Sequence, residues 1–343
     1  MGNDRGEGLW RAGSQSLVLH FHQPAGTSRG IYTTRQVWYV TLQTPDGRTG
    51  TGECAPLPGL SPEAGEGFEQ RLREACALVC RKGGIPAGAL NDCSSIRFGL
   101  ECALHELQGG VPAAPAFRQG TQGIPTNGLI WMGTHEEMAR RIEEKLAAGF
   151  RCLKLKIGAI DFTQEISLLE HIRHRYSPQE VTLRVDANGA FPPAEAMERL
   201  QRLARLGLHS IEQPIAPRQW RELSTLCRHT PLPIALDEEL IGIHRREEKI
   251  RLLDTLQPQY LILKPSLHGG LSGCDEWIAL AQERGIGWWA TSALESNVGL
   301  AHIARWVSTH QPTLPQGLGT GLLYTNNTTP LTELRGDELY YLG

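Results

Sequence analysis

The sequence predicts an α/β protein in which a βα barrel follows a smaller α+β domain. From about residue 124 onwards, apolar runs typical of buried strands alternate with amphipathic stretches typical of helices. Before that point the strand-like runs come first and the helix-like stretches follow them, which favours a separate α+β domain. A chain of 343 residues is also too long for one small core, so two domains are expected.

The N-terminal part reads as strands from about residue 15 to residue 55, because β-branched and aromatic residues are frequent there. Two segments rich in Gly and Pro, 24–30 and 56–61, are predicted loops. Helical patterns then follow over residues 68–79 and 94–107.

Eight predicted strands make up the barrel, the last of them with the weakest pattern. They cover residues 127–131, 152–157, 181–186, 208–212, 233–237, 260–264, 287–291 and 314–318. Two of the helices between them have clear apolar stripes, at Met138, Ile142 and Leu146 and at Met197, Leu200 and Leu203. No Gly-rich fingerprint follows the first strand, so a dinucleotide-binding sheet is disfavoured.

The composition excludes several classes of function. With 40% hydrophobic residues and a net charge of −3, the chain offers no electrostatic reason to bind nucleic acid or an anionic membrane. No apolar run approaches the roughly 18 residues that a membrane helix needs, and the first residues lack the order of a signal peptide. The eight cysteines are scattered and form no Cys-x-x-Cys pair, so we expect reduced, structural thiols in a cytoplasmic protein. The sequence leaves the oligomeric state open.

Five charged residues each end one of these apolar runs. They are Lys156, Asp186, Glu212, Asp237 and Lys264. The intervals between them are 186−156=30, 212−186=26, 237−212=25 and 264−237=27 residues. A strand, a helix and two short loops take about this length, so the five side chains are expected together at the carboxyl-end mouth of the barrel.

The three carboxylates among them predict a metal site. Asp186, Glu212 and Asp237 offer only oxygen ligands, and such sets suit a hard cation, so Mg²⁺ is expected and Mn²⁺ is possible. Taken singly, each carboxylate is better explained as the end of a strand that forms a salt bridge or hydrogen bond with a loop. Three carboxylates and two ammonium groups in one dry pocket are, however, costly to bury without a cation.

The lysines predict proton chemistry. Lys154 and Lys156 are two residues apart on one strand, so both point the same way, into the barrel. Lys264 ends an apolar strand on the other side. A lysine beside a divalent cation and a second ammonium has a lowered pKa and can act as a base.

This set of motifs resembles the enolase superfamily, in its muconate-lactonizing-enzyme-like subgroup. The motifs are Lys-x-Lys at 154–156, Asp-x-Asn at 186–188, Glu-Gln-Pro at 212–214, Asp-Glu at 237–238 and Lys-Pro at 264–265. Four further segments, 24–30, 52–61, 264–270 and 291–299, resemble the o-succinylbenzoate synthases of that superfamily. The resemblance implies a modified TIM barrel, (β/α)7β, at 116–315. It also implies an α+β capping domain at 1–115 that is completed by 316–343.

The resemblance also implies roles for the charged residues. Asp186, Glu212 and Asp237 would hold Mg²⁺, which binds the substrate carboxylate. Lys156 would remove the proton α to that carboxylate and then deliver it to the departing β-hydroxyl, while Lys264 steadies the anion from the opposite face. The implied reaction is syn dehydration to o-succinylbenzoate, in menaquinone or phylloquinone synthesis.

Other polar residues are expected around these groups. Lys154, Asn188 and Glu238 are predicted to support the metal ligands. Thr27, Ser28, Arg29 and Ser292 are predicted to contact a small carboxylate substrate. For Arg29, a solvated loop charge is the alternative that its position favours. Phe98 and Trp131 are expected in the core, and the histidines have no ligand spacing.

Two alternatives remain open. The same lysines and metal would serve an N-acylamino-acid racemase, a dipeptide epimerase or a muconate cycloisomerase. A barrel that has kept its fold only as a binding or scaffold module is the alternative from another class.

Overall fold

A computed structural model describes residues 10–27 and 30–343 of the protein, with the side chain of Thr27 left aside. Its N-terminal part is an antiparallel sheet in the order β1 (Arg11–Thr27), β2 (Gly30–Gln43), β3 (Thr49–Cys54). The helices α1 (Phe68–Lys82) and α2 (Ser94–Leu107) follow it and confirm the two predicted helices.

Two glycines allow α2 to lie directly on β3. A Cβ atom on Gly50 would lie 2.1 Å from the carbonyl oxygen of Ala103, and one on Gly52 would lie 1.9 Å from that of Gly99. The alternating Thr-Gly-Thr-Gly sequence therefore removes side chains from the face that the helix covers.

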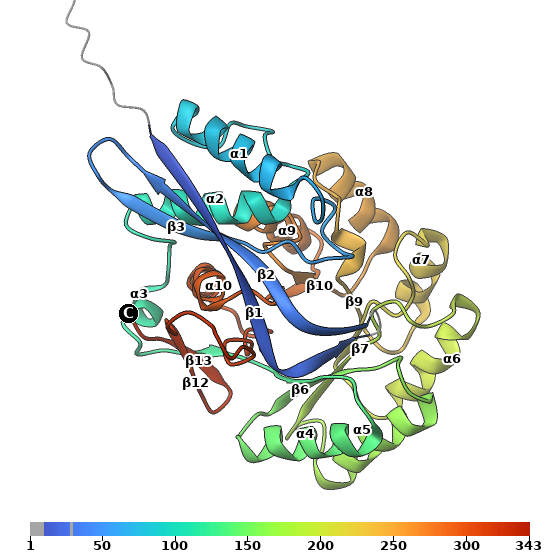
Figure 1. Ribbon diagram of the computed structural model, residues 1–343. Coiled ribbons are helices and arrows are strands. Elements are labelled where there is room, and N and C mark those ends of the chain that lie inside the picture. The colour runs from blue at the N-terminus through green and yellow to red at the C-terminus, as the bar shows by residue number, and fades with distance from the viewer. Residues whose placement is uncertain (1–9, 28–29) are drawn as a thin grey trace, which may run out of the picture.

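The predicted loop at 24–30 is wrong for residues 24–27, which belong to β1. Thr27, Gly26 and Ala25 pair with the start of β2, and the register shifts between His20 and Ala25. This irregularity accommodates Pro24, which has no N–H to give to a ladder. The end of the hairpin reaches the barrel, where Gly26 forms a bridge with Met132 (Figure 1).

The barrel sheet is parallel and has the order β11-β10-β9-β8-β7-β6-β5. Its strands are β5 (Gly128–Ile130), β6 (Cys152–Lys156), β7 (Thr182–Asp186), β8 (Ser210–Glu212), β9 (Ile234–Leu236), β10 (Tyr260–Leu263) and β11 (Gly287–Ala290). Seven of the predicted strands are thus confirmed, each slightly shorter than expected.

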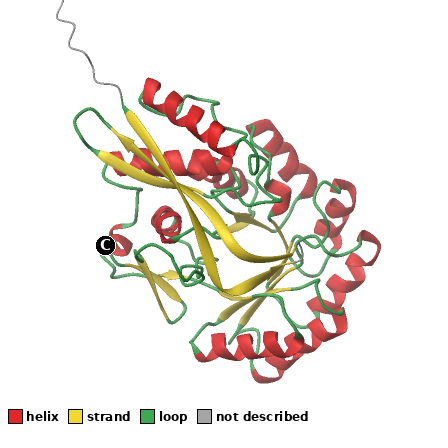
Figure 2. Ribbon diagram, in the orientation of Figure 1, coloured by secondary structure: helices red, strands yellow, loops and turns green. Residues whose placement is uncertain are grey.

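Helices lie outside these strands (Figure 2). They are α4 (His135–Ala147), α5 (Phe162–Arg175), α6 (Pro193–Ala204), α7 (Trp220–His229), α8 (Arg246–Leu256), α9 (Gly270–Gln282) and α10 (Asn297–Thr309). The short α3 (Pro115–Arg118) precedes the barrel, and the 3-10 turn η1 (Glu238–Leu240) follows β9. Of the two predicted stripes, Met138, Ile142, Leu146, Leu200 and Leu203 are buried, whereas Met197 is only half-buried. None of the helices in the described part of the chain is long and apolar enough to cross a membrane.

The eighth predicted strand, 314–318, is reduced to two bridges that close the barrel. Gln316 pairs with Thr126 on one side, and Gly317 pairs with Thr291 on the other. A Cβ atom on Gly317 would lie 2.5 Å from Thr291 Oγ1, so only glycine permits this approach. The segment is short because Pro315 lacks an N–H for a longer ladder.

The last residues return to both parts of the molecule. β12 (Thr332–Arg335) and β13 (Glu338–Tyr341) form a small sheet with β4 (Ile124–Pro125), which precedes the barrel. Residues 323 and 325 bond to the backbone of β1. Where the capping domain ends and the barrel begins stays a prediction.

Candidate active site

The barrel register brings the predicted charged residues to one level. Lys156 on β6 pairs with Asp186 on β7, and Asp186 pairs with Glu212 on β8. Asp237 and Lys264 come directly after β9 and β10. Because parallel strands end on the same side of a sheet, all five side chains lie at the same mouth of the barrel.

Lys154 and Lys156 point to the same side, as their spacing predicted. Lys154 Nζ lies 2.9 Å from Asp186 Oδ2 and 2.5 Å from Glu212 Oε2. Lys156 Nζ donates to the same Asp186 oxygen and to Asn188 Oδ1, both at 2.9 Å. The two lysines therefore share the carboxylate of Asp186.

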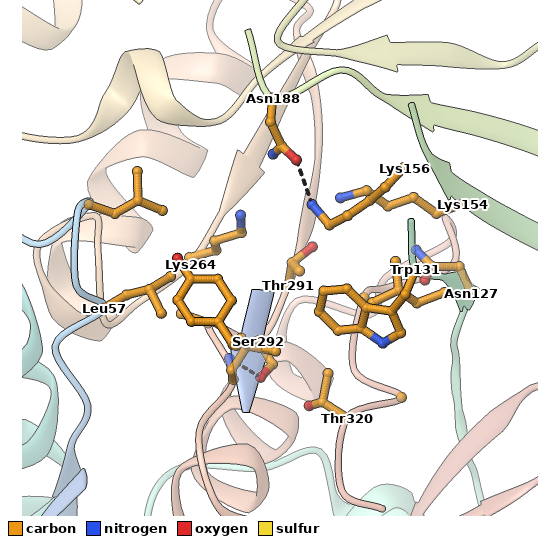
Figure 3. Close-up of a pocket in the computed structure, with 17 residues that line it drawn as sticks. Leu57, Asn127, Trp131, Lys154, Lys156, Asn188, Lys264, Thr291, Ser292 and Thr320 are labelled. Atoms are coloured by element: carbon orange, nitrogen blue, oxygen red, sulfur yellow. Dashed lines mark hydrogen bonds between the residues drawn. The ribbon is translucent and has the colours of Figure 1, made fainter. Parts of the chain in front are cut away.

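Lys264 approaches from the other side of the pocket. Its Nζ donates to Asp237 Oδ2 and lies 4.0 Å from Glu212 Oε1. Figure 3 shows the amino groups of Lys156 and Lys264 turned toward each other across the pocket. A molecule bound between them would have an amine on each face.

The pKa values of the lysines depend on these carboxylates. Burial disfavours the charged form of Lys264, but Asp237 and Glu212 outweigh burial and raise its pKa above the usual value. The pKa of Lys154 is raised for the same reasons, by Asp186 and Glu212. The expected lowering, which assumed the charge of a divalent cation, is therefore not found for these two side chains in the protein alone.

The predicted supporting residues lie beside the charged groups. Asn188 accepts a hydrogen bond from Lys156, and its Nδ2 donates to Glu238 Oε1 at 3.0 Å. Its backbone N–H donates to Asp186 Oδ1 at 3.0 Å. Asn188 has φ 44°, a left-handed conformation that asparagine tolerates better than most residues. It thereby links a metal-ligand candidate, a lysine and Glu238.

The three carboxylates have the chemistry of a cation site. Asp186, Glu212 and Asp237 are at most 2% exposed. Glu212 Oε1 and Asp237 Oδ1 have no hydrogen-bond partner among the residues that the structure describes. Burial, with Asp186 nearby, raises the pKa of Glu212 well above its usual value. Buried oxygens without donors, and a glutamate whose charged form is disfavoured, fit a divalent cation.

The carboxylates nevertheless do not form a ready-made cage. Within residues 10–27 and 30–343, no cluster of three or more His, Cys, Asp or Glu side chains is close enough to hold a metal. The reason is that the Lys154 amine lies between Asp186 and Glu212, while Lys264 bonds to Asp237. The ammonium groups take the oxygens that a cation would use.

One histidine belongs to this group although the sequence assigned it no role. His268 is 1% exposed, and its Nε2 lies 3.8 Å from Asp237 Oδ1. Burial lowers the pKa of His268 to about 3, so the ring is neutral at neutral pH. Its position four residues after Lys264, in a tight turn, was the only available signal.

Beside the charged groups lies a pocket that combines an apolar wall with a few polar groups, as small-molecule sites do. Its apolar wall includes Leu57 and Leu60 from the predicted 56–61 loop. Trp131 lines the pocket as well, so its assignment to the core was wrong, whereas Phe98 is fully buried as predicted. Trp131 follows directly after β5, at the mouth of the barrel, where a side chain faces the pocket rather than the helices.

Polar lining residues that the sequence analysis missed are Asn127, Thr291 and Thr320 (Figure 3). Thr291 directly follows β11, so the rule that found the charged residues would have found it too.

The predicted substrate contacts are only partly placed. Ser28, Arg29 and the side chain of Thr27 lie outside the described residues. Ser292 lines the pocket, but its Oγ donates to Glu295 Oε2 at 2.7 Å and accepts from the backbone of Leu294. Its hydroxyl is therefore already engaged within the protein.

Two family models match the chain. One, described as enolase C-terminal domain-like, matches residues 137–332. The other, described as MenC, N-terminal domain, matches residues 28–107.

Among curated proteins, the chain is 50% identical to an o-succinylbenzoate synthase from Desulfotalea psychrophila, over 90% of this chain and 93% of that protein. It is 25% identical to the L-Ala-D/L-Glu epimerase of Bacillus subtilis, over 87% of this chain and 84% of that one.

Among solved structures it is similar to MenC from Desulfotalea psychrophila, with a TM-score of 0.82 and 42% identity over 97% of this chain and 100% of that one. A muconate lactonizing enzyme from Pseudomonas fluorescens shares the fold, with a TM-score of 0.82 at 20% identity over 98% of this chain and 94% of that one.

Proposed function

Because the chain belongs to the enolase C-terminal domain-like family, we propose that it is an enzyme with o-succinylbenzoate synthase activity. The reaction is the dehydration of 2-succinyl-6-hydroxy-2,4-cyclohexadiene-1-carboxylate to o-succinylbenzoate, so the enzyme is a lyase. The observation that carries this proposal is 50% identity to a curated o-succinylbenzoate synthase along nearly the whole of both chains.

Enzymes of this superfamily generally use a divalent metal, and we propose Mg²⁺ for this chain. Asp186, Glu212 and Asp237 would hold it, since their buried oxygens form a hard, anionic donor set. Bound there, the cation supplies positive charge to the substrate carboxylate, which makes the neighbouring carbon more acidic. Lys154 and Asn188 would keep Asp186 in place from the sides.

Lys156 is the proposed base. It would take the proton from the carbon next to the substrate carboxylate, which breaks a C–H bond and leaves its electron pair on the substrate. The same ammonium group would then give this proton to the hydroxyl on the adjacent carbon. The C–O bond breaks, water leaves from the same face, and the six-membered ring becomes aromatic. The 2.9 Å contact with Asn188 fixes the direction of the amine.

Lys264 is proposed to remain charged throughout. Its pKa is raised by Asp237 and Glu212, so it stays an ammonium group at neutral pH. From the face opposite Lys156 it would stabilise negative charge as that charge develops. The unequal surroundings of the two lysines suit a reaction in which one amine moves the proton and the other does not.

A dipeptide epimerase is the second candidate, because two opposed lysines can also act as acid and base. The two activities are separated by offering the cyclohexadiene precursor and a panel of N-acyl amino acids and dipeptides to the purified enzyme. Efficient turnover of the precursor, with weak or absent racemisation, is the expected result. Efficient epimerisation without dehydration would overturn the proposal.

The substrate is a small carboxylate, and no partner other than this substrate is proposed. A place in menaquinone or phylloquinone synthesis follows from the product. We also propose a cytoplasmic location, because all eight cysteines are free and seven of them are buried, as suits a reducing compartment.

A further inference from the structure

His268 lies in the turn between β10 and α9, and it holds the main chain of Lys264 from two directions. Its backbone N–H donates to the carbonyl oxygen of Lys264 at 2.9 Å. Its ring Nδ1 accepts a hydrogen bond from the backbone N–H of Lys264 at 3.0 Å. The next residue, Gly269, donates to Ser94 Oγ of the capping part at 3.1 Å. The turn that carries Lys264 is thereby anchored on both sides.

The same contacts fix the tautomer of the ring. A backbone N–H can only donate, so Nδ1 carries no proton, and in a neutral imidazole the proton is then on Nε2. This Nε2–H lies 3.8 Å from Asp237 Oδ1. Neither atom has a hydrogen-bond partner among the described residues. The gap is about 0.6 Å beyond the usual limit of a hydrogen bond, so a small movement of either side chain closes it.

Asp237 is therefore contacted from two sides by groups of one turn. Lys264 Nζ donates to Oδ2, and the ring of His268 faces Oδ1. His268 also bonds to the backbone of Lys264, so the ring lies between the main chain of Lys264 and the carboxylate to which the Lys264 amine is bonded. A change in the position of His268 would move the amine and the carboxylate relative to each other.

We propose that His268 is a positioning residue of this site. Its Nδ1 holds the main chain of Lys264 and its Nε2–H orients the carboxylate of Asp237, so that the ammonium group and the metal ligand keep one relative position. The inference rests on the proposed metal site. A ring that only filled space would leave two buried polar atoms facing each other without a bond, which is unfavourable.

Two substitutions distinguish the contact of His268 with the backbone of Lys264 from its contact with Asp237. In His268→Asn, the shorter amide retains an acceptor for the backbone of Lys264 but does not reach Asp237. In His268→Gln, the longer amide retains a donor toward Asp237. The dissociation constant of Mn²⁺, measured from the electron paramagnetic resonance signal of free Mn²⁺, is expected to rise about tenfold or more in His268→Asn. In His268→Gln it is expected to stay within about threefold of the unsubstituted enzyme, because the support of the metal ligand is retained.

A matched control is His302→Asn. His302 is also a buried histidine, but it lies on α10, bonds to the backbone of Thr51 and is not among the residues that line the pocket. This variant is expected to change stability without changing the Mn²⁺ dissociation constant, and circular dichroism confirms that each protein is folded.

The outcomes distinguish this inference from the proposed function. Unchanged Mn²⁺ affinity in folded His268→Asn overturns the role of His268 alone. Equal weakening in all three variants overturns it too, since that result indicates a general effect of disturbed packing. If the unsubstituted enzyme itself does not bind Mn²⁺, both the metal site and the inference are overturned.

Discussion

Two groups of buried carboxylates lie close to the pocket, and they differ in how their oxygens are satisfied. Glu53 and Glu295 accept hydrogen bonds on both oxygens, from Ser296 and Gly299 and from Ser266, Ser292 and Ala293. We call this pair the support carboxylates. Asp186, Glu212 and Asp237, the site carboxylates, are contacted by lysines instead, and Glu212 Oε1 and Asp237 Oδ1 have no hydrogen-bond partner among the described residues.

This difference distinguishes carboxylates that stabilise the fold from carboxylates that are candidates to bind a ligand. The support carboxylates accept hydrogen bonds from neutral donors of the backbone and of serines, so each of their oxygens has a partner within the protein. The site carboxylates retain unsatisfied oxygens at the barrel mouth, at a cost in stability that a bound cation would offset. Glu53 also joins the two parts of the molecule, because it lies on β3 and bonds to the N-terminus of α10.

The largest expected effect is that of Asp186→Asn. Removing this charge from the site carboxylates should lower kcat/KM by about 10³-fold or more, because a metal ion contributes several kcal/mol of charge stabilisation. Mn²⁺ binding should weaken in parallel. Steady-state kinetics and Mn²⁺ titration test this expectation, with Glu53→Gln as the control that keeps the Mn²⁺ affinity. Equal loss of metal binding in both variants would erase the distinction between the two groups.

A somewhat smaller effect is expected for Lys156→Met, which should reduce kcat by about 10²- to 10⁴-fold, the usual contribution of a general base. The metal should still bind, since its carboxylate ligands remain. Single-turnover kinetics with saturating Mg²⁺ measure the chemical step. Lys145→Met is the matched control, because Lys145 lies on α4 with its amine over the ring of Phe150. A Lys156→Met enzyme with normal single-turnover rates would refute the assignment of the base.

Among the support carboxylates, Glu53 is expected to make the stability of the protein depend on pH. Burial raises the pKa of Glu53 to about 7 from its ordinary 4.5, despite the hydrogen bonds of Ser296. Between these two values the folded protein keeps a proton that the unfolded chain releases, so stability falls as the pH rises. The loss is complete about one pH unit above the folded-state pKa and amounts to about 3 kcal/mol.

Urea denaturation at pH 5 and pH 8 measures this contribution. The unsubstituted enzyme should lose about 2.5 kcal/mol more than Glu53→Gln over this interval, because glutamine does not titrate. Parallel losses in the two proteins would show that Glu53 is not protonated in the folded state.

The smallest effect is expected for Ser292→Ala. Its hydroxyl donates to Glu295 and accepts from the backbone of Leu294, so its removal should lower the free energy of unfolding by about 0.5–1.5 kcal/mol. The KM should rise by no more than about threefold, since that hydrogen bond is made within the protein. Thermal unfolding and steady-state kinetics check the two values. A large rise in KM with unchanged stability would return Ser292 to the substrate contacts that the sequence suggested.

The sequence predicted those parts of the molecule that local patterns determine. Apolar runs ended by charged residues located seven strands and the site charges, because strand ends and active-site positions coincide in a barrel. The extension of β1 to Thr27 was missed, since pairing across a hairpin outweighed the loop preference of Pro and Gly. The closing segment at 316–317 consists of only two bridges and carries too few residues for a periodic signal.

The surroundings of the charges were harder to predict. Trp131 and His268 lie in the segments that follow β5 and β10, and the direction in which each side chain points depends on the folded turn. The insertion of Lys154 between two carboxylates was also not predicted, although its face was. Side chains on a strand alternate between two faces, so the face of Lys154 could be predicted from its spacing. Which carboxylates it contacts depends on how the strands are arranged in the closed barrel.

The site carboxylates are expected to bind one divalent cation, next to the space between the two opposed lysines where the substrate would lie. Crystals soaked in Mn²⁺ and measured at the manganese absorption edge test it most directly. We expect a single anomalous peak within about 2.0–2.3 Å of an oxygen from each of Asp186, Glu212 and Asp237. The absence of a peak there, with Lys154 and Lys264 still bonded to these carboxylates, would contradict it.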